Sequence, residues 1–400
     1  MSNESLAIRE RAKIYPKMIY LDYAAATPVD HRVLTAMMPY FQDDFYNPSA
    51  AYLAARQVRA DVEAARHQLA QVIGAKPAEI ILTAGATESI NLAIHGVEGQ
   101  IISTAIEHSS VLAAISAKGG QVIPVDGRGQ IDLAALKAAI TDDTELISIG
   151  YVNSETGMVQ NIRRVADIVG EIRQDRQRRE IDRPLWLHTD ASQAAGLLDL
   201  NVARLGADLM TLNAGKCYGP KQVGLLYIRA GVRLKPLIYG GGQEMGLRSG
   251  TENVTGIIGF AKALELADKT RSSEVKRLSK LRSRLKNILI NGLPDLVITE
   301  NPKANSPAIL NIAVPGVDGE RVVFALDEAG VQVATGSACA ANKGLRSHVL
   351  TALGLDELTV DGSLRISLGR YTTDNDIETA GQQIIRVINE QRKFGALDVK

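Results

Sequence analysis

Short apolar runs alternate with helical patterns along the chain from about residue 18 to residue 260. Amphipathic stretches, such as residues 132–139 and 162–173, lie between several of these runs. The predicted strands are the apolar runs at 79–84, 100–105, 121–126, 145–152, 185–190, 207–212 and 223–228. Strands that alternate with helices indicate an α/β fold, with a mainly parallel seven-stranded sheet covered by helices. Ligands of such sheets bind beyond the carboxyl ends of the strands, so the loops there are the first candidates for a functional site.

The pattern changes near residue 260. Residues 258–292 carry a helical stripe, and an α+β pattern follows to the end of the chain. A chain of 400 residues also exceeds what one hydrophobic core usually serves. We therefore expect a large domain over residues 18–260 and a smaller α+β domain formed by residues 1–17 and 261–400.

The composition excludes several classes of protein. Lysine plus arginine equals aspartate plus glutamate, at 45 each, which argues against a general binder of nucleic acids or membrane surfaces. Two cysteines are too few for a disulfide framework and fit a reducing compartment. The amino terminus is polar and charged, and no apolar run approaches the length of a membrane span. We expect a soluble, cytoplasmic protein with no direct contact to membranes or nucleic acid.

Two strand ends carry the most informative side chains. Lys216 follows the apolar run 207–212 inside a glycine-rich turn, and Asp190 ends the run 185–190. An amine at one strand end and a carboxylate at another are the two groups that a pyridoxal phosphate (PLP) site requires. The amine forms a Schiff base and the carboxylate keeps the pyridine nitrogen protonated. Lysine and aspartate often end strands at the protein surface, so either residue alone is weak evidence. The interpretation depends on matching residues in the other loops.

Two more strand-to-helix junctions carry polar groups. Gly85, Ala86 and Thr87 open a helical pattern, where free backbone N–H groups and a hydroxyl favour a phosphate. His108 follows the next predicted strand and could stack on a flat ring or carry protons near neutral pH. A plain turn and a helix-capping histidine are the alternatives.

Amides and a glycine-rich loop add further candidates. Asn153 follows another predicted strand, and Gln193 lies three residues after the carboxylate at 190, so both could contact the same ring. The segment 239–251 has too many glycines for a regular element, and Arg248 and Thr251 could bind an anion there. A turn-forming asparagine and an ordinary surface loop are the alternatives.

The carboxyl-terminal part contributes a thiol and a cation. Cys339 lies among glycine and small residues, which suits an accessible nucleophile, whereas Cys217 has the surroundings of a buried thiol. Arg365 alternates with Leu364 and Ile366 along a strand, and its guanidinium could clamp a carboxylate. Neither the cysteines nor the histidines have metal-ligand spacing, so we predict no metal.

Together these motifs resemble those of the cysteine desulfurases, PLP-dependent enzymes of the class-V aminotransferase group with the fold type I architecture. The resemblance covers nearly the whole chain, in the family's order and spacing, which is far more specific than any single motif. The stretch after Cys339 is similar to the long cysteine loop of the housekeeping-type branch. The motifs are IYLDYAAATP (19–28), NPSA, TAGATES, EHSSV, VNSETG, HTDASQ, GKCYGPKQVG, GGGQEMGLRSGT, GSAC and LRISLGRYTT.

The resemblance implies a role for each matching residue. The implied catalytic residues are Lys216, Cys339 and His108. The implied PLP contacts are Lys216, Asp190, Gln193, Asn153, His108, Gly85, Ala86, Thr87, Asn213 and, from the neighbouring subunit of a homodimer, Thr251. The implied substrate contacts are Arg365, Asn153 and Asn47.

The implied activity is the conversion of L-cysteine to L-alanine, with the sulfur passing as a persulfide to Cys339 and then to a protein acceptor. An iron–sulfur scaffold and a tRNA-thiolation enzyme are both compatible acceptors. His108 is the candidate acceptor for the proton of the Cys339 thiol. The family's usual histidine and serine beside the cofactor phosphate are replaced here by Gly215 and Asn213. We therefore expect looser retention of PLP than is usual for the family.

Two other interpretations stay open. A selenocysteine lyase or another class-V aminotransferase would share most of the site, although transamination needs no thiol such as Cys339. A catalytically weak family member that acts as a binding or regulatory subunit is the alternative from a different class. Gly215 is the feature that favours this second alternative.

Overall fold

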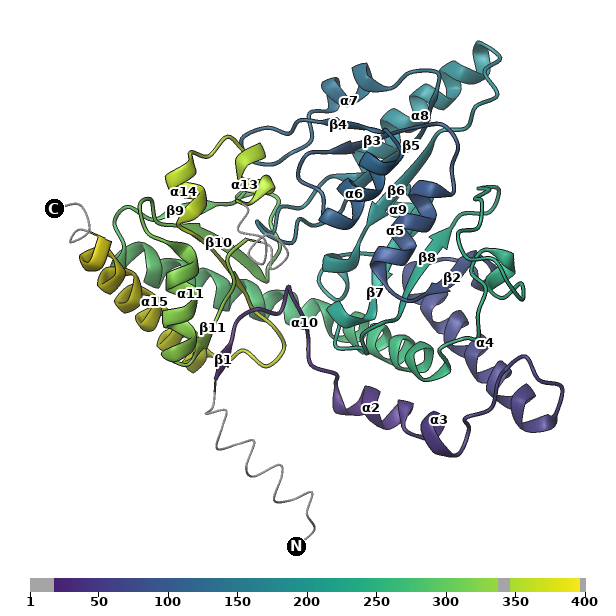
Figure 1. Cartoon of the computed structure of the whole chain (residues 1–400), viewed down its shortest axis with the longest axis horizontal. Helices are drawn as coiled ribbons and strands as arrows, with labels where there is room; N and C mark the ends of the chain where they lie inside the picture. Colours follow the sequence, from purple (N-terminus) through teal and green to yellow (C-terminus); the bar gives the residue numbers. More distant parts are fainter. Residues whose placement is uncertain (1–17, 337–345, 396–400) are drawn as a thin grey trace, which may run out of the picture.

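The structure is a computed structural model that describes residues 18–336 and 346–395 (Figure 1). Its larger sheet has seven strands, which are the seven that the apolar runs predict. In spatial order they are β2 (Ile80–Thr83), β8 (Gly224–Ile228), β7 (Leu209–Asn213), β6 (Trp186–Asp190), β5 (Thr144–Gly150), β3 (Gln100–Thr104) and β4 (Gln121–Ile123). Every neighbouring pair is parallel except the two pairs that β8 makes with β2 and β7. The predicted α/β class with a mainly parallel sheet is confirmed.

Helices cover both faces of this sheet because successive strand residues point to opposite sides. In β2, Ile80 and Leu82 join one buried cluster, whereas Ile81 joins another with residues of α5 and α6. Strand β2 is therefore buried on both faces of the sheet. The helices of this part are α2 (His31–Met37), α3 (Pro39–Gln42), α4 (Leu53–Ile73), α5 (Ala86–His95), α6 (Ser109–Ala117), α7 (Leu133–Ala139), α8 (Ile162–Arg178) and α9 (Val202–Leu205).

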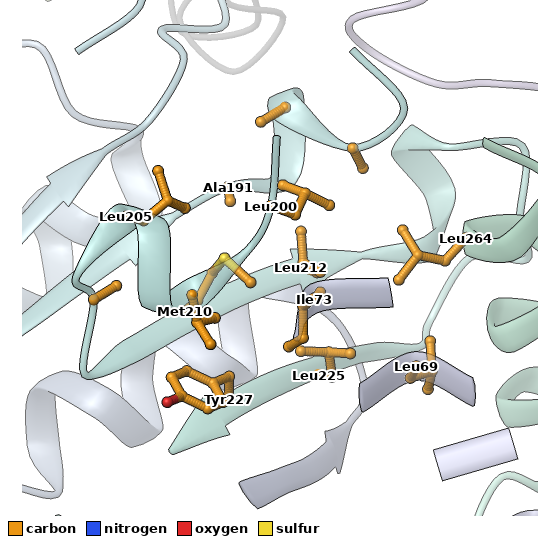
Figure 2. Close-up of a cluster of buried hydrophobic side chains, with 14 of the residues drawn as sticks. Leu69, Ile73, Ala191, Leu200, Leu205, Met210, Leu212, Leu225, Tyr227 and Leu264 are labelled. Carbon is orange, nitrogen blue, oxygen red and sulfur yellow. The ribbon is translucent and has the colours of Figure 1, made fainter. Parts of the chain in front are cut away.

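The larger of these clusters lies between the sheet and the long helices (Figure 2). Leu69 and Ile73 of α4 face Leu212 and Leu225 of the sheet, and Leu264 of α10 (Val254–Gly292) lies beside them. All five side chains are almost completely buried. Burial of one such side chain contributes about 1.5–3 kcal/mol. The strand ends that carry Asp190 and Lys216 are therefore anchored in a rigid layer.

The carboxyl-terminal part has its own small sheet and core. Three antiparallel strands lie in the order β12 (Ser363–Ser367), β10 (Ile309–Ala313) and β9 (Val297–Thr299). A separate two-stranded parallel sheet pairs β1 (Ile19–Tyr20) with β11 (Val331–Gln332). The helices of this part are α11 (Gly319–Glu328), α13 (His348–Ala352), α14 (Glu357–Asp361) and α15 (Asp374–Gly395).

One continuous helix, α10 (Val254–Gly292), connects the two cores. Its Leu264 packs in the core of the large sheet, and its Leu285 packs in the second core together with Leu21. The predicted domain limits stay a prediction, and these contacts favour a division inside α10, with residues 19–21 beside the carboxyl-terminal part. Within the described residues, no helix combines the length and apolarity that a membrane crossing requires.

Candidate active site

A cavity of about 270 Å³ opens beyond the carboxyl ends of the parallel strands, where the sheet rule places a ligand. Loops that follow β3, β5, β6 and β7 form one side, and β12 and α13 contribute the other. Nine of the predicted site residues line it together: Ala86, Thr87, His108, Asn153, Asp190, Gln193, Asn213, Lys216 and Arg365. Residues that are far apart in the sequence thus meet in one place.

Lys216 ends a short 3-10 helix, Ala214–Lys216, directly after β7. Its Nζ donates hydrogen bonds to the carbonyl oxygens of Ala24 at 2.8 Å and Ala25 at 2.7 Å. Gln193 donates from Nε2 to the same Ala24 oxygen at 2.9 Å. Asp190 is the last residue of β6, and its Oδ1 accepts from the backbone N–H of residue 192 at 3.0 Å. The segment 24–25 therefore orients two candidate PLP contacts through carbonyls that sequence reasoning did not identify.

The start of α5 has the features of a phosphate cradle. Gly85 precedes the helix with φ of +135°, a backbone conformation that residues with a side chain rarely adopt. Glycine has no side chain that could cap the helix, so the first N–H groups of α5 keep their partial positive charge. Arg248 is bound to Glu88 at 2.9 Å in the first turn of this helix. This ion pair offsets the only acidic side chain of that turn.

His108 caps α6, as the capping interpretation predicts, and it also lines the cavity, whereas its role toward a ligand stays a prediction. Its Nδ1 accepts from the backbone N–H of Ser110 at 3.1 Å and lies 2.7 Å from the Ser110 hydroxyl. Burial lowers the pKa of His108, the charge of Asp190 raises it, and the charges of Lys216 and His348 lower it further. A neutral ring is therefore favoured in this structure.

Asn153 is bound on both sides of its amide. Its Nδ2 donates to the Ile106 carbonyl at 2.8 Å, and its Oδ1 accepts from the backbone N–H groups of Glu155 and Thr156, each at 2.9 Å. The turn-forming interpretation is therefore confirmed for this residue, although it also lines the cavity. Any contact that it makes with a ligand would be an addition to these hydrogen bonds.

Two of the three guanidinium nitrogens of Arg365 are hydrogen-bonded within the described residues. One terminal nitrogen donates to Asp22 Oδ1 at 2.7 Å, and the other approaches the Ser154 carbonyl at 3.4 Å. Its Nε is buried and has no hydrogen-bond partner within the described residues. An unsatisfied buried donor on a cavity wall fits a carboxylate ligand, since such a donor otherwise costs about 1–3 kcal/mol.

Three titratable residues of the cavity were not identified from the sequence. Glu107 is almost fully buried, and burial, reinforced by the charge of Asp190, raises its pKa to about 7. Burial also raises the pKa of Glu155, which accepts from the Ser347 hydroxyl at 2.5 Å. His348 lines the cavity as well. Its hydrogen bond to the Glu107 carbonyl joins segments that are 241 residues apart, so no local sequence pattern marks this position.

Asn213 and Gly215, the two positions that depart from the family pattern, lie in the turn before Lys216. Asn213 accepts with Oδ1 from the backbone N–H of Gly215 at 3.0 Å, which holds the turn before Lys216. A β-carbon built at residue 215 would lie 3.5 Å from that oxygen and 3.7 Å from Lys221 Cγ, which are ordinary contact distances. The backbone at residue 215 therefore accepts a β-carbon without a close contact.

Among the described residues, Gly85, Asn47 and Thr251 were predicted for the site but do not line this cavity. Asn47 is exposed, and its Oδ1 accepts from the backbone N–H of Ser49 at 2.9 Å. Thr251 is exposed as well. Cys339 lies outside the described residues. Cys217 is buried as predicted, and burial raises the pKa of its thiol to about 12. A search of the described chain found no cluster of side chains able to hold a metal ion.

The chain belongs to the class-V aminotransferase family, whose model matches residues 19–379. Its similarity to cysteine desulfurases within that family is confirmed. It is 38% identical over 392 residues to cysteine desulfurase IscS 1 of Archaeoglobus fulgidus, covering 95% of this chain and 99% of the relative.

Solved structures agree with this grouping. A NifS-like protein superposes with a TM-score of 0.84 at 35% identity, covering 93% of this chain and 100% of that protein. A structure described as SspA in complex with cysteine superposes with a TM-score of 0.73 at 33% identity, covering 88% and 99%. Enzymes of this family are PLP-dependent.

Proposed function

We propose that this chain is a cysteine desulfurase that binds PLP, converts L-cysteine to L-alanine and passes the sulfur as a persulfide to Cys339. One observation carries the proposal. A single cavity unites an amine on Lys216, a carboxylate on Asp190 and a partly unsatisfied guanidinium on Arg365. These are the groups needed for a pyridine aldehyde and for an amino acid carboxylate.

The residues of the cavity fit PLP. The open first turn of α5 with Ala86 and Thr87 suits the phosphate, and Asp190 suits the ring nitrogen. Lys216 would hold the cofactor covalently, after its amino group leaves the Ala24 and Ala25 carbonyls. When bound, PLP supplies an electron-withdrawing ring that accepts the electron pair released at the substrate's α-carbon.

The chain's own groups then divide the remaining work. Arg365 would bind the substrate carboxylate through the edge that carries its unsatisfied Nε, while Asp22 keeps the guanidinium oriented. Lys216, released from the cofactor, would take the α-proton. His108 presents a neutral ring to the same cavity and would stack on the cofactor.

We further infer that the enzyme is a homodimer. Large apolar side chains are exposed before and at the start of α4 and in the segment 239–245; this exposed apolar patch comprises Phe41, Phe45, Tyr52, Leu53, Tyr239 and Met245. The two segments are neighbours, because Pro48 and Ser49 share a surface cleft with residues 241–245. A second copy of the chain would cover this patch and place its Thr251 beside the neighbouring cofactor.

Persulfide chemistry also bears on location and on partners. A free thiol that must stay reactive suits a reducing compartment such as the cytoplasm. An iron–sulfur scaffold and a tRNA-thiolation enzyme are both suitable sulfur acceptors. Incubation of the persulfidated enzyme with each candidate acceptor, followed by mass spectrometry of the acceptor, separates them.

Purified protein tests the proposal directly. Wild-type enzyme should show the visible absorption of a lysine-bound cofactor and should form alanine from cysteine in a one-to-one ratio with transferred sulfur. Cys339→Ser should keep the absorption and lose the persulfide, and Lys216→Ala should lose turnover. The matched control is Cys217→Ala, which removes the buried thiol and should still form the persulfide. Sulfide release by Cys339→Ser at the wild-type rate would refute the assignment.

The same assays discriminate the alternatives. A selenocysteine lyase would yield selenide from selenocysteine and little alanine from cysteine, and an aminotransferase would yield a keto acid. A binding or regulatory subunit would show neither the cofactor absorption nor turnover.

A further inference from the structure

The cavity contains a second imidazole besides that of His108. His348 is the first residue of α13 and lines the same cavity. The hydroxyl of Ser347 fixes the start of the helix, because it accepts from the Leu350 N–H at 3.1 Å and donates to Glu155. Val349 packs beside Ile106 in a small buried cluster. The ring of His348 is therefore supported by an ordered framework.

The hydrogen bonds of His108 determine which ring nitrogen carries a proton. A backbone N–H can only donate, so Nδ1 of His108, which accepts from Ser110, carries no proton. In the neutral ring the proton is then on Nε2. His108 can thus offer a proton to a ligand, but its basic nitrogen is already occupied within α6.

His348 has the opposite arrangement. Its Nε2 lies 2.9 Å from the backbone carbonyl oxygen of Glu107, and a carbonyl can only accept, so Nε2 carries the proton. The neutral ring therefore has its lone pair on Nδ1. No residue of the described chain donates a hydrogen bond to this atom. The two histidines that line the cavity therefore differ in their neutral forms, because His108 carries its proton on Nε2 and His348 has its lone pair on Nδ1.

We propose that His348 is the group that accepts the proton of the substrate's thiol, at Nδ1. This inference rests on the proposed desulfurase function. His348 lines the same cavity as Arg365 and Lys216, the residues that would bind the carboxylate and meet the amine of the substrate. The S–H bond breaks, its electron pair stays on sulfur, and the proton forms an N–H bond on the ring. The imidazolium returns this proton to water after the product leaves.

The charges around the ring support this direction of transfer. The carboxyl of Glu155 lies close enough for the charge of His348 to lower its pKa, so a charged ring and a carboxylate favour one another. The Glu107 carboxyl is bound by the Thr104 hydroxyl at 2.6 Å and by the Gly150 N–H at 2.9 Å. The cationic groups that line the same cavity are Lys216, Arg365 and, when it is charged, His108.

A glutamine at residue 348 separates a proton role from a structural one. Its amide nitrogen can replace Nε2 as the donor to the Glu107 carbonyl, but it cannot bind a proton. Alanine formation and KM are measured against pH for the holoenzyme, for His348→Gln and for His348→Ala. The matched control is His67→Gln, an exposed histidine of α4.

The expected result is a pH-dependent defect. His348→Gln should lose roughly a hundredfold in kcat near neutral pH, with little change in KM or in the cofactor's absorption. The defect should shrink as the pH passes ~8.5, where a thiol ionises without help. A wild-type rate in His348→Gln, or a defect of equal size at every pH, overturns the proposal.

A binding measurement decides the question without turnover and without a variant. Mercaptopropionate carries the thiol and carboxylate of the substrate but lacks its amine. On binding to wild-type holoenzyme at neutral pH it should show the ultraviolet absorbance of a thiolate, and absence of that signal overturns the proposal. A wild-type enzyme that makes no alanine from cysteine refutes the proposed function instead.

Discussion

Replacing Glu107 by glutamine removes a titratable proton from the cavity wall with almost no change of shape. The side chain is 5% exposed, and its two oxygens accept from Thr104 and from the N–H of Gly150. Glutamine reproduces the protonated form, because its oxygen can accept from Gly150 while its nitrogen donates to the Thr104 hydroxyl. Any difference between the two proteins therefore reports the cost of ionising this residue.

The sign and the size of that cost follow from the pKa. Burial raises the pKa of Glu107 from 4.5 to about 7, so between these values the folded chain binds a proton that the unfolded chain lacks. The stability that the residue contributes is complete below 4.5 and is lost as the pH rises through about 7. At about 1.4 kcal/mol per pH unit the loss is about 3 kcal/mol.

Urea unfolding, followed by the fluorescence of the single tryptophan, Trp186 on β6, measures this difference. We expect Glu107→Gln to match or fall below the wild type near pH ~5 and to exceed it near pH ~8 by up to about 3 kcal/mol. The control is Glu328→Gln, an exposed glutamate of α11, whose difference from the wild type should stay constant. A constant difference for Glu107→Gln as well would refute the reasoning.

Gly215→His should strengthen PLP binding roughly tenfold, because residue 215 accepts a β-carbon and the ring would add a charge-assisted hydrogen bond. Titration of apoprotein with PLP measures this, and Gly215→Ala should show no gain. Arg365→Lys should raise KM for cysteine roughly tenfold with a smaller change in kcat, because an ammonium lacks the planar fork; an unchanged KM in steady-state kinetics contradicts this. Tyr239→Glu should shift the protein toward the monomer in sedimentation experiments, whereas Leu358→Glu, exposed but outside the exposed apolar patch, should not.

The strands and the strand-end residues could be predicted because local patterns determine them. Runs of apolar residues become strands that are buried on both faces, and their carboxyl ends meet at one edge of the sheet. The positions of Asp190 and Lys216 follow from this rule alone. Arg365 follows from strict alternation in β12, since Leu364 and Ile366 turn into the second core. The resemblance to the cysteine desulfurases then indicated the reaction, which the sheet rule does not determine.

The other half of the cavity wall could not be predicted, because it depends on contacts between distant segments. His348 contacts the carbonyl of Glu107, which is 241 residues away, and Ser347 contacts Glu155 across 192 residues. Such contacts leave no periodicity or spacing in the sequence. The burial that raises the pKa of Glu107 likewise results from the packing of distant loops, and the residues next to it in the sequence do not indicate it.

The amino-terminal segment 22–25 contacts both the proposed carboxylate-binding residue, Arg365, and the proposed cofactor-binding residue, Lys216. Asp22 orients Arg365 across 343 residues, and the carbonyls of Ala24 and Ala25 hold the amino group of Lys216. The lysine must give up the two carbonyls to reach the cofactor, whereas the arginine can keep its aspartate and bind a carboxylate through the unsatisfied Nε. One segment thus offers the lysine hydrogen bonds that it can exchange for a covalent bond. The same segment fixes the arginine in the orientation in which it meets the substrate.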